Sequence, residues 1–301
     1  MGERFETLLE GGAFFECPRW HEGRWYVSDF YRYAVYAVDQ DGGSEEHFHV
    51  EGQPSGIGWL PDGSLIAVSK RERKIFKRGQ DGGSSVHADL SDLVDSDLND
   101  MVVSAEGHAY VGEFGFDTMT AEDPVYACLF RVTPDGAVYR EADDLAFPNG
   151  SVIAPDGKTL IVGESVACRY SAFDIAPDGS LSNKRIWAQI APAPPFEGPG
   201  AEFLGSLPLA VDGCCLDSEG HIWAADAFGG RLIRVAPGGE IVAEIAAPPE
   251  TGFIACALGG EDRRTLMIAA GPLEWNESVR SKTRDGTLLT TRVEVPGAGL
   301  P

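Results

Sequence analysis

The chain has 301 residues, 43% of them apolar and 24% charged, a balance typical of a globular protein with a sizeable core. Its formal net charge of −23 at pH 7 argues against nucleic acid or an anionic membrane as a partner, because both attract basic surfaces. The N-terminal segment MGERFETLLEGG lacks the apolar stretch of a secretory signal, and no run approaches the length of a membrane span, so we expect a cytoplasmic protein.

A unit of short strands and tight turns repeats along the chain. Six units begin near residues 14, 54, 98, 148, 211 and 252. Their spacing of about 40 to 60 residues is typical of propeller blades. In the second unit an apolar run at 56–60 precedes the turn Pro61-Asp62-Gly63 and a strand at 64–69, and related turns recur at 134–136, 155–157, 177–179 and 217–220. Glycine supplies the positive φ of such turns, and Pro or Asp starts them.

These units predict an all-β fold, a single six-bladed β-propeller over residues 1–301 with four-stranded blades around a central channel. The chain has 37 Gly and 19 Pro and no sustained 3.6-residue apolar period, so we expect almost no helix. Residues 4–9 precede the first inner strand and are expected to pair with residues 288–295 as the outer strand of the last blade, which would close the ring. Two unrelated β-domains are the disfavoured alternative, because the turn pattern continues without a linker.

Four of the units carry one oxygen-bearing side chain at the same early position, namely Glu16, Asn99, Asn149 and Asp212. Because the first strands of all blades line the channel, we expect these positions to converge at one mouth. Two carboxylates and two amides suit Ca²⁺, Mg²⁺ or Mn²⁺, and hold Zn²⁺ or Fe²⁺ less selectively. The alternative is that the Asn-Gly and Asp-Gly pairs are ordinary turns, and spacing alone does not decide between the two.

The same segments resemble a known family. ECPRW at 16–20, Asn-Asp at 99–100, Pro-Asn-Gly at 148–150 and Asp-Gly-Cys at 212–214, with GHIWA at 220–224 and GGRLIR at 229–234, are similar to the gluconolactonase, regucalcin (senescence marker protein) and luciferin-regenerating enzyme family over nearly the entire chain. The resemblance implies a six-bladed propeller with one divalent cation held by Glu16, Asn149 and Asp212. Among the divalent cations, Ca²⁺ is the first expectation. It places Asn99 against the substrate or a metal-bound water.

Two departures from the family concern the substrate. Members that take sugar lactones resemble one another in an Arg two residues before the blade-three Asn, where this chain has Asp97. A carboxylate cannot donate to sugar hydroxyls as a guanidinium does, so we expect gluconolactone to be a poor substrate. The segment after the blade-three strand carries Phe114 and Phe116 and favours a less polar substrate; packing of both rings between blades is the equal alternative.

The predicted activity is gluconolactonase-like hydrolysis of a lactone or similar cyclic ester. A cation with three protein ligands leaves room for the carbonyl oxygen and a water, and Asp212 is the best general base, as the resemblance also implies. Glu113, Glu164 and Asp226 are further candidates for substrate contact, since each lies late in or just beyond a channel-side strand, although solvated positions would explain them equally. Residues 191–209, rich in Pro and Gly, are either a lid or a passive loop.

Other functions remain open at this point, because a propeller fold does not decide chemistry. A non-catalytic propeller that binds a divalent cation is one alternative, and another ester or carbonyl reaction at the same site, such as a cyclisation in secondary metabolism, is a second. The expected partner is a small-molecule lactone or ester. The six cysteines show no metal-ligand spacing, so we expect buried thiols, with a strained Cys214–Cys215 disulfide as the alternative. The sequence does not determine the natural substrate, the physiological metal or the oligomeric state.

Overall fold

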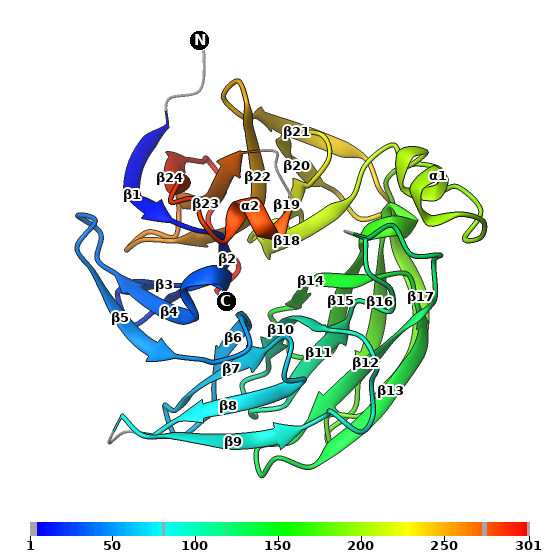
Figure 1. The fold of residues 1–301 in the computed structure, drawn as a ribbon, viewed down its shortest axis with the longest axis horizontal. Helices are drawn as coiled ribbons and strands as arrows, with labels where there is room; N and C mark the ends of the chain where they lie inside the picture. The colour runs from blue at the N-terminus through cyan, green and yellow to red at the C-terminus, as the bar shows by residue number, and fades with distance from the viewer. Residues whose placement is uncertain (1–4, 80–81, 119, 273–275, 300–301) are drawn as a thin grey trace.

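The computed structural model describes residues 5–79, 82–118, 120–272 and 276–299. In this part of the chain the strands form six antiparallel four-stranded sheets, arranged around a central axis as the blades of a propeller (Figure 1). The six-bladed architecture predicted from the turn pattern is confirmed.

The blades follow the chain in order, and within each blade the strands run from the channel outwards. Blade one contains β2 (Phe15–His21), β3 (Arg24–Asp29), β4 (Ala34–Val38) and β5 (Ser44–His49). Blade two contains β6 (Pro54–Trp59), β7 (Leu65–Ser69), β8 (Lys74–Arg78) and β9 (Ser84–Asp89). Blade three contains β10 (Leu98–Val103), β11 (Ala109–Glu113), β12 (Ala127–Val132) and β13 (Val138–Leu145).

Blade four contains β14 (Pro148–Ile153), β15 (Thr159–Glu164), β16 (Arg169–Ile175) and β17 (Leu181–Gln189). Blade five contains β18 (Val211–Leu216), β19 (Ile222–Asp226), β20 (Arg231–Val235) and β21 (Ile241–Ala246). Blade six contains β22 (Thr251–Gly259), β23 (Thr265–Pro272), β24 (Gly286–Arg292) and β1 (Glu6–Gly12).

The ring closes through its first strand. β1 pairs antiparallel with β24, from Glu6 opposite Thr290 to Gly12 opposite Gly286, so the N-terminal strand is the outermost strand of the last blade. This confirms that the N-terminal strand pairs into the last blade, with bounds that differ from the predicted 4–9 and 288–295: the strands are Glu6–Gly12 and Gly286–Arg292. Residue 4 lies outside the described residues. Because one sheet is built from both ends of the chain, opening the ring would expose a strand edge and cost its hydrogen bonds.

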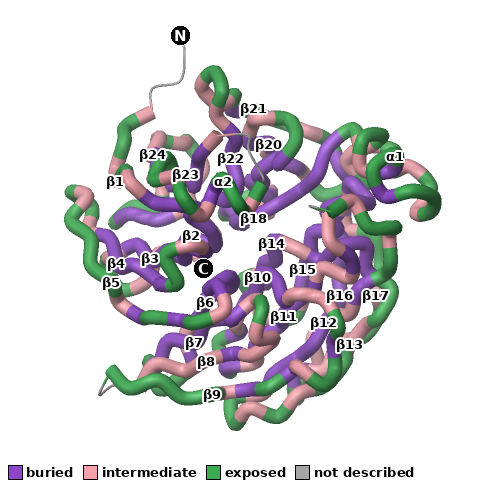
Figure 2. The backbone as a smooth tube through the Cα atoms, in the orientation of Figure 1, coloured by how far each residue is buried: buried purple, intermediate pink, exposed green. Residues whose placement is uncertain are grey.

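Burial decreases from the channel outwards (Figure 2). Every residue of β18 is buried, whereas in the outer strand β21 only Ile245 is. Neighbouring inner strands approach closely where glycine stands: a Cβ on Gly150 would lie 2.3 Å from the carbonyl oxygen of Asp212, and one on Gly56 would lie 2.2 Å from the Met101 nitrogen. Gly150 thus lets β14 approach β18, which carry Asn149 and Asp212, and Gly56 lets β6 approach β10, which carries Asn99.

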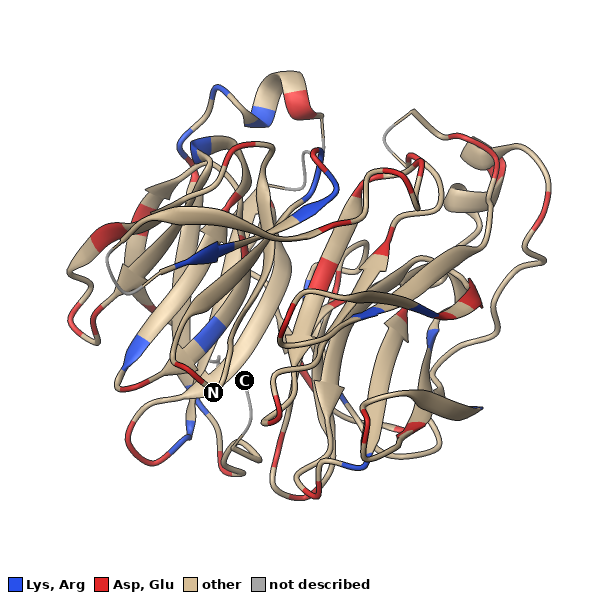
Figure 3. Ribbon diagram, turned by 90° about the horizontal axis from the view of Figure 1, so that it is seen from below, with Lys and Arg blue, Asp and Glu red and all other residues tan. Residues whose placement is uncertain are grey.

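Helix is confined to short segments, as predicted. They are the 3₁₀ turns η1 (Phe30–Arg32) and η2 (Ser165–Ala167) and the helices α1 (Gly200–Gly205) and α2 (Glu277–Arg280). In the described residues, none of these is long and apolar enough to cross a membrane. Acidic residues lie on loops at both ends of the propeller and on outer strands, rather than in one patch (Figure 3).

The C-terminal segment lies across the end of the channel away from the starts of the inner strands. Its backbone bonds to blade five, because the Ser218 nitrogen donates to the Pro296 carbonyl and the Ala298 nitrogen donates to the Leu216 carbonyl. Leu216 is the last residue of β18, whereas the candidate ligand Asp212 stands near its start. The two ends of the channel therefore differ, and the candidate site lies at the end opposite this segment.

Candidate metal and substrate site

A β-bulge interrupts the first strand of blades one to five near its start. In blade three Leu98 pairs with Glu113, and the next pair is Met101 with Val111, so two residues of β10 oppose one residue of β11. The same shift occurs in blades two, four and five. In blade one it falls one residue later, at Cys17 and Pro18, because Glu16 pairs with Ser28. A bulge re-aims the side chains at its position and is common next to functional sites.

The register places the four candidate side chains at the same level of the channel. In each of these blades the last residue of the second strand pairs with a residue of the first strand. The candidate side chain belongs to the next residue along the first strand, which is Glu16, Asn99, Asn149 or Asp212. Ser55 is the equivalent residue in blade two. Four inner strands therefore direct an oxygen-bearing side chain to the mouth, as the repeat predicted.

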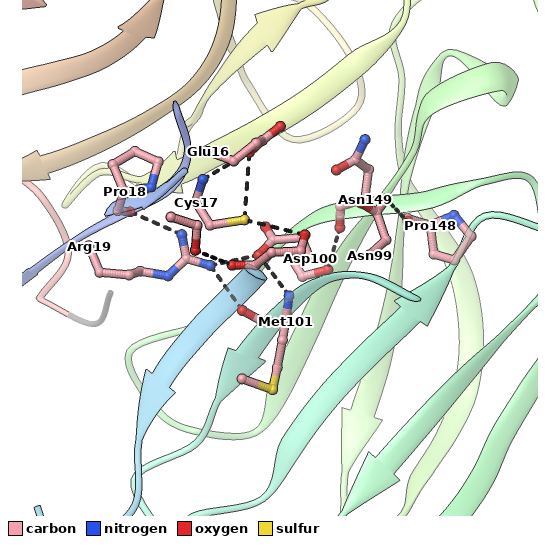
Figure 4. Close-up of polar contacts among 12 residues, drawn as sticks. Glu16, Cys17, Pro18, Arg19, Asn99, Asp100, Met101, Pro148 and Asn149 are labelled. Carbon is pink, nitrogen blue, oxygen red and sulfur yellow. Dashed lines mark hydrogen bonds and ion pairs between the residues drawn. The ribbon is translucent and has the colours of Figure 1, made fainter. Parts of the chain in front are cut away.

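Hydrogen bonds hold each of these side chains. Glu16 Oε2 accepts from the Cys17 backbone nitrogen at 2.8 Å, Asn99 Nδ2 donates to the Pro148 carbonyl at 2.9 Å, and Asn149 Nδ2 donates to Ser165 Oγ at 3.2 Å. Figure 4 shows the Glu16 and Asn149 side chains near one another, with Asn99 beside Asn149. Asn149 also bonds to the Asp212 carboxylate.

The site concentrates negative charge in a buried place. Glu16 and Asp212 are each only 8% exposed, and neither has an ion pair within the described ranges. Burial raises the pKa of Glu16 well above its ordinary value, and the nearby carboxylates of Asp212 and Asp100 raise it further. Burial also raises the pKa of Asp212, to about 7, with a further increase from Asp100. Two buried carboxylates are costly to ionise side by side, and a positively charged ligand would offset that cost.

The donor set fits a divalent cation. Two carboxylates and the Asn149 amide offer oxygen ligands, which hard cations such as Ca²⁺ and Mg²⁺ prefer. In the described residues no three His, Cys, Asp or Glu side chains come together to hold a metal, so a site here needs the amide as its third protein ligand.

A buried ion pair lies next to this site and was not foreseen. Arg19 donates to Asp100 Oδ1 at 3.0 Å and to the Met101 carbonyl at 2.9 Å, and both charged side chains are almost fully buried (Figure 4). The motifs ECPRW and LNDM contain the two residues, but their contact joins blades one and three and is invisible in the sequence. The pair fixes the inner strands that carry Glu16 and Asn99.

A cavity of about 880 Å³ opens above the four side chains. Its wall includes Asp97, Phe114 and Phe116, as predicted. Both rings also pack against Phe147, with ring centres 4.6 Å apart for Phe114 and 5.9 Å apart for Phe116. The two side chains therefore line the cavity and pack against a neighbouring segment at the same time. The lining also contains further aromatic side chains, which the sequence analysis missed, namely Phe14, Phe30, Tyr31, Phe147 and Phe228.

The structure places the other predicted acids outside the cavity lining. Glu113, Glu164 and Asp226 each end the second strand of a blade, where the carboxylate binds the segment that leads into the same blade. Glu113 accepts from Ser96 Oγ and from the Cys128 nitrogen. These acids stabilise the fold, so we do not assign Glu113 or Glu164 to the substrate.

The carboxylates of Glu164 and Asp226 also accept hydrogen bonds from structural partners. Glu164 accepts from the Ala146 nitrogen at 2.9 Å and from Arg169 Nε at 2.8 Å. Asp226 accepts from the Ala210 nitrogen at 3.2 Å and from Arg231 Nε at 3.1 Å. The position recurs because the end of the second strand lies beside the entry to the first.

The segment 191–209 contributes to the cavity wall through Leu204. Its helix α1 lies at the periphery of the propeller (Figure 1) and packs against the loop between β11 and β12. Phe196 lies 4.3 Å from Tyr126 and 6.3 Å from Phe116, measured between ring centres, and the Gly200 nitrogen donates to Asp123 Oδ1 at 3.2 Å. Two long loops thus support each other on one side of the mouth.

The cysteines are free thiols, and all but Cys128 are buried. The prediction of buried thiols therefore holds for the other five, and Cys214 and Cys215 form no disulfide. Burial raises the pKa of Cys17 well above its ordinary value, which keeps the thiol next to Glu16 protonated.

The chain is similar to proteins of a known family. The model of the SMP-30/gluconolactonase/LRE-like family matches residues 14–271, which includes all four candidate side chains. The chain belongs to this family.

Relatives of the SMP-30/gluconolactonase/LRE-like protein carry several names. It is 29% identical to regucalcin of Danio rerio over 70% of this chain and 67% of the relative. It is 24% identical to a 6-deoxy-6-sulfogluconolactonase of Pseudomonas putida over 95% and 93%, and 26% identical to a pentonolactonase of Haloferax volcanii over 95% and 92% of the two chains.

Solved structures agree with the fold of this SMP-30/gluconolactonase/LRE-like chain. Regucalcin from Agrobacterium tumefaciens, described as a calcium-binding protein, superposes with a TM-score of 0.80 at 20% identity and covers all of this chain and 97% of that one. A luciferin-regenerating enzyme superposes with a TM-score of 0.79 at 20% identity, over 98% and 97% of the two chains. At this identity the match supports the fold alone.

Proposed function

We propose that this protein is a metal-dependent hydrolase of a lactone or a similar cyclic ester. The observation that carries the proposal is the pair of buried carboxylates, Glu16 and Asp212, which form no ion pair with the described residues and lie at the base of a cavity large enough for a small organic molecule. Two relatives similar over nearly their full length are named as lactonases, which supports the same class of substrate.

Glu16, Asn149 and Asp212 would hold the cation, and Ca²⁺ is our first candidate because all three offer oxygen. When bound, the cation supplies Lewis-acid polarisation of the ester carbonyl and lowers the pKa of water.

Asp212 is the general base in this proposal. Its carboxylate takes a proton from the water whose oxygen attacks the carbonyl carbon, the ring C–O bond breaks, and the same group returns the proton to the leaving alkoxide, so the product is a hydroxy acid. Asn99, fixed by its bond to the Pro148 carbonyl, orients the substrate or the water. Phe114 and Phe116 favour a substrate with apolar carbon next to the ester.

The test is turnover of a lactone panel by protein stripped of metal, with and without added Ca²⁺, Mg²⁺, Mn²⁺ or Zn²⁺. We expect hydrolysis to depend on the metal and to return with it. Asp212→Ala should lose the metal in elemental analysis, whereas the surface variant Asp156→Ala should keep it. Full metal occupancy in Asp212→Ala would overturn the ligand assignment, and metal binding without turnover of any lactone or ester would favour the non-catalytic alternative.

A further inference from the structure

Lys70 occupies the cavity wall directly after β7, and no motif singled it out. Its ammonium lies 2.9 Å from Asp97 Oδ2, 4.7 Å from the ring centre of Phe114 and 5.6 Å from that of Phe30. The side chain is only 12% exposed. Asp97 and two aromatic rings therefore hold the Lys70 ammonium at the edge of the cavity.

The backbone of Lys70 is fixed as well. Its nitrogen donates to the Gln53 carbonyl at 2.9 Å, and its carbonyl accepts from the Leu98 nitrogen at 3.1 Å, which ties it to the strand that carries Asn99. A lysine ammonium has three N–H donors, whereas the ion pair with Asp97 involves a single carboxylate oxygen, at 2.9 Å. Donor capacity thus remains in a side chain that lines the cavity and has little freedom to turn away.

The charges of the wall decide which acceptor suits this donor. Asp97 already neutralises Lys70, and the other cation of the lining, Arg71, is paired with Glu277. Asp95, Glu16 and Asp212 also line the cavity. An anionic group would meet this excess of carboxylates, so the acceptor that fits best is a neutral oxygen.

We propose that Lys70 is a specificity-determining residue that donates a hydrogen bond to a hydroxyl or carbonyl oxygen on the non-reacting part of the substrate, while carbon of the same molecule packs on Phe114. The substrate class is then an apolar or aryl lactone that carries a neutral oxygen remote from the ester. This inference rests on the proposed function, because it assumes that the reacting ester sits at Glu16, Asn149 and Asp212. A site that offers a directed donor discriminates against an analogue lacking the acceptor by about tenfold or more.

Equilibrium binding of lactams tests the inference without turnover. The ligands are 3,4-dihydroquinolin-2-one, derivatives hydroxylated at each position of its aromatic ring, and the corresponding carboxylates, titrated calorimetrically into the full chain in excess Ca²⁺. We expect at least one hydroxylated lactam to bind about tenfold more tightly than the bare one. Lys70→Met should abolish this preference while changing the affinity for the bare lactam less than about twofold.

Two further variants control the comparison. Lys77→Met breaks a similar lysine–aspartate pair, Lys77 with Asp62 at 2.7 Å, outside the cavity lining, and should keep the preference. Asp97→Asn keeps the donor but removes its counter-charge, so it should keep the preference and bind the carboxylated lactams more tightly than the wild type does.

Three results would overturn the assignment: no preference for any hydroxylated lactam in the wild type, an unchanged preference in Lys70→Met, or carboxylated lactams as the best ligands of the wild type. Binding of none of the lactams counts as the first result. Failure of the proposed function would look different, because the protein would then discriminate between lactams in this assay yet hydrolyse no lactone of the metal-supplemented panel.

Discussion

Replacing Asp212 with Asn should stabilise the metal-free protein, and the effect should depend on pH. In the metal-free fold the pKa of Asp212 is about 7, against 3.8 ordinarily, mainly because of burial. A raised pKa means that folding favours the protonated acid. The stability that protonated Asp212 contributes is therefore fully present below pH 4 and is lost as the pH rises to about 7. The difference between a pKa of 3.8 and one of about 7 corresponds to about 4 kcal/mol of folding stability lost above pH 7, an upper bound because water entering the cavity screens the charge.

The assay is denaturant unfolding in chelator between pH 4.5 and 8.5. At pH 8 the free energy of unfolding of Asp212→Asn should exceed that of the wild type, and the gap should shrink steadily towards pH 4.5. In saturating Ca²⁺ the order should reverse, because the wild type alone offers two carboxylates to the ion. Asp29→Asn is the matched control, since that buried carboxylate accepts from the Ala13 and Phe14 nitrogens and its replacement should destabilise at every pH.

A refuting result is simple to recognise. If Asp212→Asn in chelator is less stable than the wild type by the same amount across the pH range, the carboxylate carries no buried charge cost. The cavity would then be wetter than its burial indicates, and the physical case for a cation at Glu16 and Asp212 would fail.

Three other predictions concern single groups. Asn99→Ala should keep metal and fold while kcat/KM falls by about 10²-fold, the scale of one positioned contact; loss of the metal instead would make Asn99 a ligand. Arg19→Met should destabilise by about 3–5 kcal/mol in urea unfolding, because it leaves Asp100 buried and unpaired, and a loss below 1 kcal/mol would contradict this. Gluconolactone should be hydrolysed more slowly than aryl lactones, since aromatic rings line the cavity and Asp97 is bound to Lys70; the opposite order in a panel would refute that argument.

The sequence by itself determined the architecture of this protein. Tight turns at Pro-Asp-Gly segments are local, so the number of blades, the starts of their inner strands and the outer position of the N-terminal strand could all be predicted. The equivalence of Glu16, Asn99, Asn149 and Asp212 was also visible, because closing a ring of similar units brings equivalent positions together.

Only the tertiary structure decided what surrounds those positions. Glu113 and Glu164 looked like site residues in the chain, yet Glu113 accepts from Ser96 Oγ and Glu164 from the Ala146 nitrogen, both at blade entries. Arg19 and Lys70 looked unremarkable, yet one pairs with Asp100 from another blade and the other lies between Asp97 and two aromatic rings in the cavity wall. Such contacts join blades through side chains. Their partners are set by the twist and packing of sheets far apart in the sequence, which no local pattern encodes.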